Sequence, residues 1–287
     1  MSKRYWISLT ALVLAWLSRR GAKRFSHEPI LHEYHLETSH WREEKEARLL
    51  FLSDYAGGNA AITADDLYRL TKAAAPDVVV LGGNFFHAKG GNEEAFRYIH
   101  LLKDKLPVWL IAGDHEATAP EAFYARLHEE GVTPLLNQGE SLTKGTGRIE
   151  ALGLEPETLY GGSLLWENAL AKALKKETNE QGAHPLRIVF AHRPNRRDIL
   201  DLIKADVAIC GGTGGGLWRL PLFGGVFSKR QGFMPRYDAG RYAIRAGAHT
   251  YQLIVSRGLE VFNLIPRYRN RPEALVLIVR QSPLEKV

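Results

Sequence analysis

Short apolar runs alternate with amphipathic segments along most of the chain. Runs of about four to eight apolar residues bounded by Gly, Asp or Pro are typical of buried strands. Such runs are RLLFLSD, DVVVLGG, PVWLIAGD, RIEALGL, LRIVFAH, DVAICGG, YQLIVSRG and EALVLIVR. The segments between them predict helices over Ala64–Ala75, Asn92–Leu106, Ala119–Gly131, Leu164–Lys176 and Asn195–Lys204. This order of elements predicts an α/β layered fold with much parallel sheet, covered on both faces.

The N-terminus carries a separate apolar run. Residues 5–17 are mostly apolar and have basic residues on both sides. The run is shorter than the roughly 20 residues of a typical spanning helix, and no small-residue cleavage site follows it. Trp6 and Trp16 would lie at the membrane interfaces. We predict an uncleaved hydrophobic anchor over residues 1–24, with a signal peptide as the alternative, and one domain over residues 25–287. The larger basic cluster after the run predicts a cytoplasmic main domain.

The composition is that of an ordinary globular domain. The chain has 287 residues, of which 45% are hydrophobic and 24% charged, so it can bury one large core. Its single cysteine, Cys210, excludes a disulfide framework and a cysteine zinc site. Because Cys210 ends an apolar strand, we predict a buried and inert thiol.

The net charge of +6 owes much to three basic segments. They are the flanks of the anchor, SKRQGFMPRYDAGRYAIR and PRYRNRPE. Such segments predict solvated surface, and near an anchor they suit an anionic membrane face. No nucleic-acid-binding motif accompanies them, so nucleic acid is not an expected partner. The histidines of HEPILHEYHLETSHW lack the spacing of a helical zinc motif, and the alternation in ILHEYHLE predicts a surface strand.

The segment DVAICGGTGGGLWRLP, Asp206 to Pro221, superficially resembles a phosphate-binding loop. In such a loop, backbone N–H groups converge at the start of a helix. Neither the Lys of the Walker motif nor the third small residue of the dinucleotide motif is present. LWRLPLFGG follows the glycines and contains Pro221 and two further glycines, which disfavour the start of a helix. The segment therefore predicts a flexible turn at a strand end.

Polar residues follow several predicted strands at the carboxyl ends, where open α/β sheets bind ligands. They belong to the blocks SDYA, GGN, GDHE, AHRP and GGTGGG, in that order. This series resembles the calcineurin-like metallophosphoesterases, in which the blocks are Ser-Asp-x-His, Gly-Asp, Gly-Asn-His-Asp/Glu, a strand-end His and Gly-His-Thr-His-Gly-Gly. The chain is most similar to a membrane-anchored bacterial branch that includes UDP-2,3-diacylglucosamine hydrolases. The resemblance covers about residues 48–280 and implies a four-layer α-β-β-α sandwich, with two mixed sheets packed face to face and helices outside.

The resemblance also implies a site that binds divalent metal, Mn, Fe or Zn. The positions that match metal ligands are Asp54, Asn84, Asp114 and His192, and His115 matches the acid for the leaving group. Ala56, Gly212 and Gly214 stand where the family has imidazoles. The glycines of the quoted segment therefore mark lost ligands. Arg193, together with Arg196 and Arg197, is a candidate for binding substrate phosphate.

These replacements weaken the implied metal site. The bridging carboxylate becomes Asn84, and an amide is a poor anionic bridge between two dications. A two-metal mechanism needs bridging and terminal O or N ligands and is therefore disfavoured. One weakly held metal on Asn84, Asp114 and His192, helped by His87 or Glu116, is one alternative. A metal-free, catalytically inactive domain is the other.

Three functions remain open at this stage. The first is a membrane-anchored pseudoenzyme that uses the phosphoesterase fold for binding. The second is a slow one-metal phosphoesterase acting on a lipid-linked or nucleotide-diphosphate substrate. The third is a basic protein that binds an anionic membrane surface and whose pocket has no role. Rebuilding the metal site would take several substitutions together, and the backbone at positions 212 and 214 would have to accept Cβ atoms.

Overall fold

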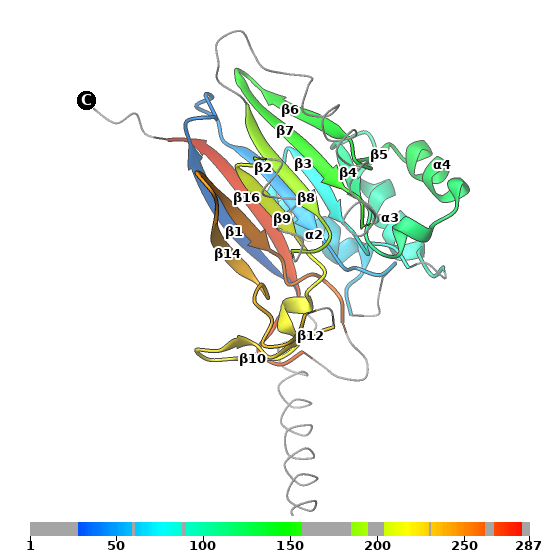
Figure 1. The fold of residues 1–287 in the computed structure, drawn as a ribbon. Coiled ribbons are helices and arrows are strands. Elements are labelled where there is room, and N and C mark those ends of the chain that lie inside the picture. The colour runs from blue at the N-terminus through cyan, green and yellow to red at the C-terminus, as the bar shows by residue number, and fades with distance from the viewer. Residues whose placement is uncertain are drawn as a thin grey trace, which may run out of the picture.

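The computed structural model describes residues 28–58, 61–87, 90–156, 185–194, 204–229, 231–261 and 267–282. Within them, two six-stranded sheets form the centre of the molecule (Figure 1). The first has the order β1 (Ile30–Thr38), β16 (Glu273–Gln281), β2 (Ala47–Leu52), β3 (Val78–Gly82), β4 (Val108–Ile111) and β5 (Val132–Pro134). The second has the order β14 (Gly240–Ala246), β15 (His249–Val255), β9 (Val207–Cys210), β8 (Leu186–Ala191), β7 (Gly147–Leu154) and β6 (Gly139–Lys144).

Both sheets are mixed. In the first, β2, β3, β4 and β5 run parallel, whereas β16 is antiparallel to β2. In the second, β7, β8, β9 and β15 run parallel, whereas β6 and β14 are antiparallel to their neighbours. Parallel strands bring their carboxyl ends to one edge of a sheet. The loops after β2, β3, β4, β8 and β9 are therefore placed to meet.

The first sheet separates two cores, and alternate residues of β2 enter each. Leu49 and Phe51 share a buried cluster with Ile188 and Phe190 of β8, so this cluster lies between the sheets. The rings of Phe51 and Phe190 stack with 6.0 Å between their centroids. Leu50 belongs to a different cluster, on the opposite face. This period of two is the expected geometry of a strand buried on both faces.

Among the described segments, three α-helices cover that opposite face. They are α2 (Ala64–Ala74), α3 (Glu93–Leu102) and α4 (Glu121–Glu129). Leu67, Ile99 and Leu127 of these helices share a buried cluster with Leu50 and Val79 of the sheet. The predicted helices at 164–176 and almost all of 195–204 lie outside the described residues. The predicted α/β class, with two mixed sheets face to face, is confirmed and is consistent with an α-β-β-α sandwich.

The prediction for α3 was too long. A helix was expected over Asn92–Leu106, but the helix ends at Leu102. Asp104 has a φ of 60°, in the left-handed region, and therefore interrupts the helical turn. Pro107 follows, and proline disfavours helical backbone at the residue before it.

Two other local predictions hold. In β1, exposed and buried residues alternate from residue 33 to residue 37, so this strand lies at the surface with Tyr34 and Leu36 inward. Cys210 is fully buried, and burial raises the pKa of its thiol to about 12.

The glycine segment contains one short helical turn that the sequence did not predict. η2 (Gly214–Gly216) is a 3₁₀ turn, and the hydroxyl of Thr213 accepts a hydrogen bond from the Gly215 backbone N–H. Gly215 has a φ of 63°, which glycine adopts without steric penalty. The glycines therefore permit a turn that other residues would resist.

A small lobe follows this turn and belongs to neither large sheet. We call residues 217–229 and 231–238 the hairpin lobe. Its two hairpins pair β10 (Arg219–Leu220) with β11 (Gly224–Gly225), and β12 (Phe227–Ser228) with β13 (Gly232–Phe233). The lobe lies at one end of the sandwich, beyond the sheets (Figure 1).

No helix in the described part of the chain has the length and apolarity needed to cross a membrane. The predicted anchor at residues 1–24 lies outside that part.

Candidate functional site at the strand ends

The predicted site residues come from loops of both sheets. Asp54 follows β2, Asn84 follows β3, and Asp114 and His115 follow β4 in the first sheet. His192 follows β8 and the glycine segment follows β9 in the second sheet. The contacts described below form two groups, one around Asp54 and one around Asn84. Gly83 lies where the two groups meet. A Cβ atom built on it would lie 2.6 Å from Nδ1 of His192 and 3.0 Å from the Cα atom of Gly113.

Asp54 and His192 form the first group. Both are buried, and His192 Nε2 lies 3.8 Å from Asp54 Oδ1, which is too far for a hydrogen bond. His192 Nδ1 lies 3.2 Å from the carbonyl oxygen of Gly82. A proton on Nδ1 would leave Nε2, with its lone pair, facing the carboxylate. The other carboxylate oxygen, Asp54 Oδ2, accepts a 3.0 Å hydrogen bond from the Gly212 backbone N–H.

Glu116 organises the second group. Its buried carboxylate accepts hydrogen bonds from three backbone N–H groups, those of Asn84 at 2.9 Å, Gly113 at 2.9 Å and Phe86 at 3.0 Å. These bonds tie the loop after β3 to the loop after β4. Asn84 Oδ1 in turn accepts a 3.1 Å hydrogen bond from the His115 backbone N–H. Glu116 therefore acts as a structural clamp, and its oxygens point at amides rather than into a shared metal position.

His115, the predicted acid, is half-buried beside a second histidine. Its Nδ1 lies 3.0 Å from the carbonyl oxygen of Phe86. Its ring packs edge-on against the ring of His87, with 5.1 Å between centroids and an interplanar angle of 65°. Two imidazoles, one from the loop after β3 and one from the loop after β4, thus lie next to each other.

Asp114 forms an ion pair with Arg193. The Asp114 side chain is 20% exposed and that of Arg193 is 10% exposed, so the pair is largely shielded from water. A shielded ion pair attracts more strongly than one at the surface, because the surroundings screen it less. The residue predicted to bind substrate phosphate therefore neutralises a residue predicted to bind metal. Arg196 and Arg197 lie outside the described residues.

Arg267 is a site residue that the sequence did not single out. The PRYRNRPE segment was predicted to be solvated, but Arg267 is 1% exposed, which corrects that prediction. Burial lowers the pKa of Arg267 to about 10, while the carboxylates of Glu260, Asp54 and Glu273 oppose the shift. For Glu260, burial and then the charge of Asp54 raise the carboxyl pKa. The charges of Glu260 and Glu273, on either side of Arg267 in the sequence, and of Asp54 from a distant loop thus act on this buried arginine. The basic composition of the segment gives no sign of that burial.

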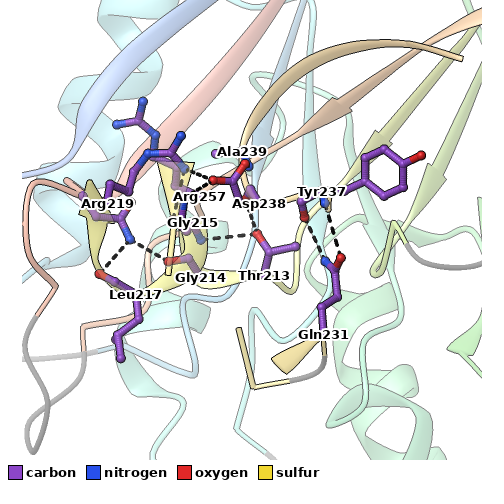
Figure 2. Close-up of polar contacts among 12 residues, drawn as sticks. Thr213, Gly214, Gly215, Leu217, Arg219, Gln231, Tyr237, Asp238, Ala239 and Arg257 are labelled. Carbon is purple, nitrogen blue, oxygen red and sulfur yellow. Dashed lines mark hydrogen bonds and ion pairs between the residues drawn. The ribbon is translucent and has the colours of Figure 1, made fainter. Parts of the chain in front are cut away.

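The glycine segment connects the site to the hairpin lobe through Asp238 (Figure 2). Thr213 Oγ1 donates a 2.6 Å hydrogen bond to the carbonyl oxygen of Asp238. The carboxylate of Asp238 accepts from Arg219 Nη1 at 2.8 Å and from the hydroxyl of Tyr242 at 2.7 Å. Burial raises the pKa of Asp238. Hydrogen bonds from Tyr242 and from two backbone N–H groups and the charge of Arg219 together lower it by more, so the net pKa lies below its ordinary value.

The two glycine positions predicted to have lost imidazoles do not suit a metal centre. Gly212 and Gly214 have φ values of 68° and 61°, in the left-handed region. A Cβ atom on Gly212 would lie 2.7 Å from the carbonyl oxygen of His192. Among the residues that the structure describes, no group of three or more His, Cys, Asp and Glu side chains could hold a metal ion. The residues present therefore do not fit the two-metal centre of the family.

The comparison with known proteins identifies the class of the fold and then the family. Two face-to-face mixed sheets with polar residues at the strand ends define a metallophosphatase-type sandwich. A family profile for calcineurin-like phosphoesterases matches residues 47–214. The chain belongs to the calcineurin-like phosphoesterase family, whose members typically bind divalent metals.

Individual relatives are distant. The chain is 24% identical over 181 residues to an uncharacterized metallophosphoesterase, YkoQ of Bacillus subtilis, a match that covers 60% of this chain and 62% of the relative. It thus spans less than two thirds of the length of YkoQ. It is 26% identical over 239 residues to the phosphodiesterase YaeI of Escherichia coli, covering 80% of this chain and 81% of the relative. Among solved structures, the NAD nucleotidase of Haemophilus influenzae aligns with a TM-score of 0.49 and 14% identity, covering 76% of this chain and 46% of that one.

Proposed function

We propose that this chain is a catalytically impaired member of the family, in which buried arginines balance the charge that metals balance elsewhere. The ion pair between Arg193 and Asp114 supports this most directly. Arginine stays protonated in proteins, so a dication approaching Asp114 would have to displace a permanent cation. The repulsion between that cation and the dication adds to the loss of the ion pair. Both effects lower metal affinity at this position.

The surroundings of Asp54 support the same proposal. The charge of Asp54 acts on the buried guanidinium of Arg267, and one of its carboxylate oxygens is engaged by the Gly212 N–H. Each of the two acidic residues at the implied metal positions, Asp54 and Asp114, thus has an arginine in its electrostatic environment. The module would retain a partly basic site without the ions that activate a hydroxide.

Metal analysis of the full-length protein tests this proposal. After saturation with Mn²⁺ and gel filtration, mass spectrometry should find well under one metal ion per chain. Arg193→Gln should bind Mn²⁺ more tightly because it removes the competing cation. Arg69→Gln removes an exposed arginine that pairs with Asp66 on the surface of α2, and should leave binding unchanged. Near-stoichiometric binding of two metals by the unmodified protein would refute the proposal.

A slow one-metal phosphoesterase is the second candidate. It is supported by the 3.8 Å approach of His192 Nε2 to Asp54, by the adjacent imidazoles of His87 and His115, and by the similarity to a protein named phosphodiesterase. Under this candidate, Mn²⁺ should stimulate hydrolysis of bis-p-nitrophenyl phosphate, and both His192→Ala and Asp54→Asn should abolish it. Equal rates in the folded variants and the unmodified protein would reject it.

The proposal extends to ligand and location. A phosphate-containing lipid or a nucleotide diphosphate is the ligand that the branch with UDP-2,3-diacylglucosamine hydrolases suggests, and residues 1–24 would anchor the protein with its main domain on the cytoplasmic side. Arg193 is the candidate phosphate contact. Asp114→Ala should then strengthen binding of UDP, because it frees the guanidinium from its carboxylate, and isothermal titration would measure the change.

A further inference from the structure

The hairpin lobe exposes an unusual amount of apolar surface. Within the described residues, every large hydrophobic side chain that is exposed lies between positions 220 and 234: Leu220, Leu222, Phe223, Phe233 and Met234. Leu222 is 102% exposed and therefore has almost no protein contact. Phe233 is 79% exposed, although its ring packs edge-on against that of Phe227 with 5.4 Å between centroids. Single exposed apolar residues are ordinary, whereas a group confined to one small element marks an interaction surface.

The backbone holds these side chains out in a defined arrangement. In the first hairpin, Val226 N donates to the Trp218 carbonyl oxygen at 2.8 Å, and the Asp238 carboxylate accepts from the Gly225 N–H and from Arg219. In the second, Gln231 Nε2 donates to the Tyr237 carbonyl oxygen at 2.8 Å (Figure 2). The exposed side chains therefore project from hydrogen-bonded hairpins, each of which is tied to the segment ending at Asp238.

Two of the exposed residues occupy backbone conformations that suit glycine. Leu222 has a φ of 71° and Met234 a φ of 50°. Large apolar residues rarely adopt the left-handed region, because their Cβ atom crowds the following carbonyl group. Glycine or asparagine would relieve this strain. The fully exposed Leu222 side chain buries no surface within the described fold and Met234 is 54% exposed, so the strain at these positions is consistent with a role outside the fold.

The charge of the lobe identifies the kind of partner. From Thr213 to Asp238 the chain has four basic residues, Arg219, Lys229, Arg230 and Arg236, and one acidic residue, Asp238, which pairs with Arg219. Lys229 and Arg236 are exposed, and Lys229 pairs with Glu260. The lobe thus keeps a net positive charge. Exposed apolar side chains on a lobe with a net positive charge suit the interface of a bilayer that contains anionic lipid. A second copy of the chain fits less well, because pairing two lobes would bring like charges together.

We propose that the hairpin lobe docks on an anionic phospholipid bilayer and inserts Leu222 and Phe223 of the first hairpin with Phe233 and Met234 of the second. The lobe follows η2 directly, and Thr213 bonds to Asp238 across their junction. Docking therefore holds the strand-end site against the membrane surface. This inference does not depend on the metal content of the site or on the N-terminal apolar run, so it stands or falls separately from the proposed function.

Depth-sensitive labelling of the full chain tests the proposal even if residues 1–24 also bind lipid. Leu222→Cys and Phe233→Cys each receive an environment-sensitive fluorophore, and Ala248→Cys serves as the matched control. Ala248 is exposed in the turn after β14, at the end of that strand away from the lobe. Cys210 is buried, and the unmodified protein treated with the same reagent provides the blank.

The protein is reconstituted in vesicles of phosphatidylcholine with phosphatidylglycerol. Labels at 222 and 233 should shift to shorter wavelength, and aqueous iodide should quench them less than it quenches the same labels without vesicles, because a large apolar side chain that inserts leaves water. The label at 248 should remain accessible. Labels at 222 and 233 that stay as accessible as the control would overturn the proposal. Protection that appears without vesicles and rises with protein concentration would overturn it in favour of self-association.

Discussion

Replacing Gly212 by alanine should destabilise the protein more than replacing Gly232, although the two glycines have similar backbones. Their φ values are 68° and 74°, so each substitution places an L-residue in the left-handed region, which costs about 1–2 kcal/mol. The surroundings differ. A Cβ atom on Gly212 would lie 2.7 Å from the carbonyl oxygen and 3.1 Å from Nε2 of His192, whereas nothing lies within 4 Å of one on Gly232.

The clash at Gly212 has no easy relief. The carbonyl oxygen of His192 also accepts a hydrogen bond from the Gly211 N–H at 3.2 Å, and the His192 ring is buried. Overpacking of this kind typically adds about 1–3 kcal/mol. We therefore expect Gly212→Ala to lower the free energy of unfolding by about 2–5 kcal/mol in total, and Gly232→Ala by about 1–2 kcal/mol.

Urea denaturation of the full chain, monitored by circular dichroism in the same detergent for both variants, measures the two free energies of unfolding. Equal losses for the two variants would show that crowding against His192 is not significant. A loss below about 1 kcal/mol for Gly212→Ala would show that residue 212 does not adopt the left-handed conformation in the folded protein.

The same argument bears on rebuilding the metal site. A histidine at position 212 carries the same Cβ atom as alanine and meets the same contact. We therefore expect the combined variant to have a lower free energy of unfolding than the unmodified protein and no higher affinity for Mn²⁺. It carries Ala56→His, Asn84→Asp, Asp114→Asn, Gly212→His and Gly214→His. Calorimetry in the presence and absence of Mn²⁺ separates the two effects, and a stable variant that Mn²⁺ stabilises further would contradict this expectation.

Three further predictions follow from single side chains. Glu116→Gln should lower the free energy of unfolding by about 2–3 kcal/mol, because a charged acceptor of three backbone N–H groups is lost; thermal unfolding should show no such loss for the exposed Glu121→Gln. The folded-state pKa of Asp238 lies below its ordinary value of 3.8, so its stabilising contribution is complete above about pH 5 and is lost as the pH falls through the folded-state pKa. Asp238→Asn should flatten this acid limb, and an unchanged limb would exclude Asp238 as its cause. Cys210, with its thiol pKa raised to about 12 by burial, should react with a thiol reagent at pH 8 only after unfolding.

The order of apolar runs was sufficient to predict the central strands and the class of the fold, but not β5, β6 and β14 of the two sheets. Strands such as β2 and β8 are continuous apolar segments, and their burial on both faces follows from that local pattern. The blocks at the strand ends located Asp54, Asn84, Asp114 and His192 at one edge, because parallel strands place their carboxyl ends together. The resemblance of these blocks to the family also predicts Gly212 and Gly214 as the positions of missing imidazoles, and this stays a prediction.

Only the tertiary structure decided what surrounds those residues. The pairing of Asp114 with Arg193 joins loops from different sheets, and the charge of Asp54 acts on the buried Arg267, more than 200 residues later in the chain. Periodicity describes which face of an element is buried, but it holds no information about which charges meet across two sheets. The exposure of Leu222 and of the apolar residues near it was also decided by the tertiary structure. An apolar segment is exposed when no other element of the fold packs against it.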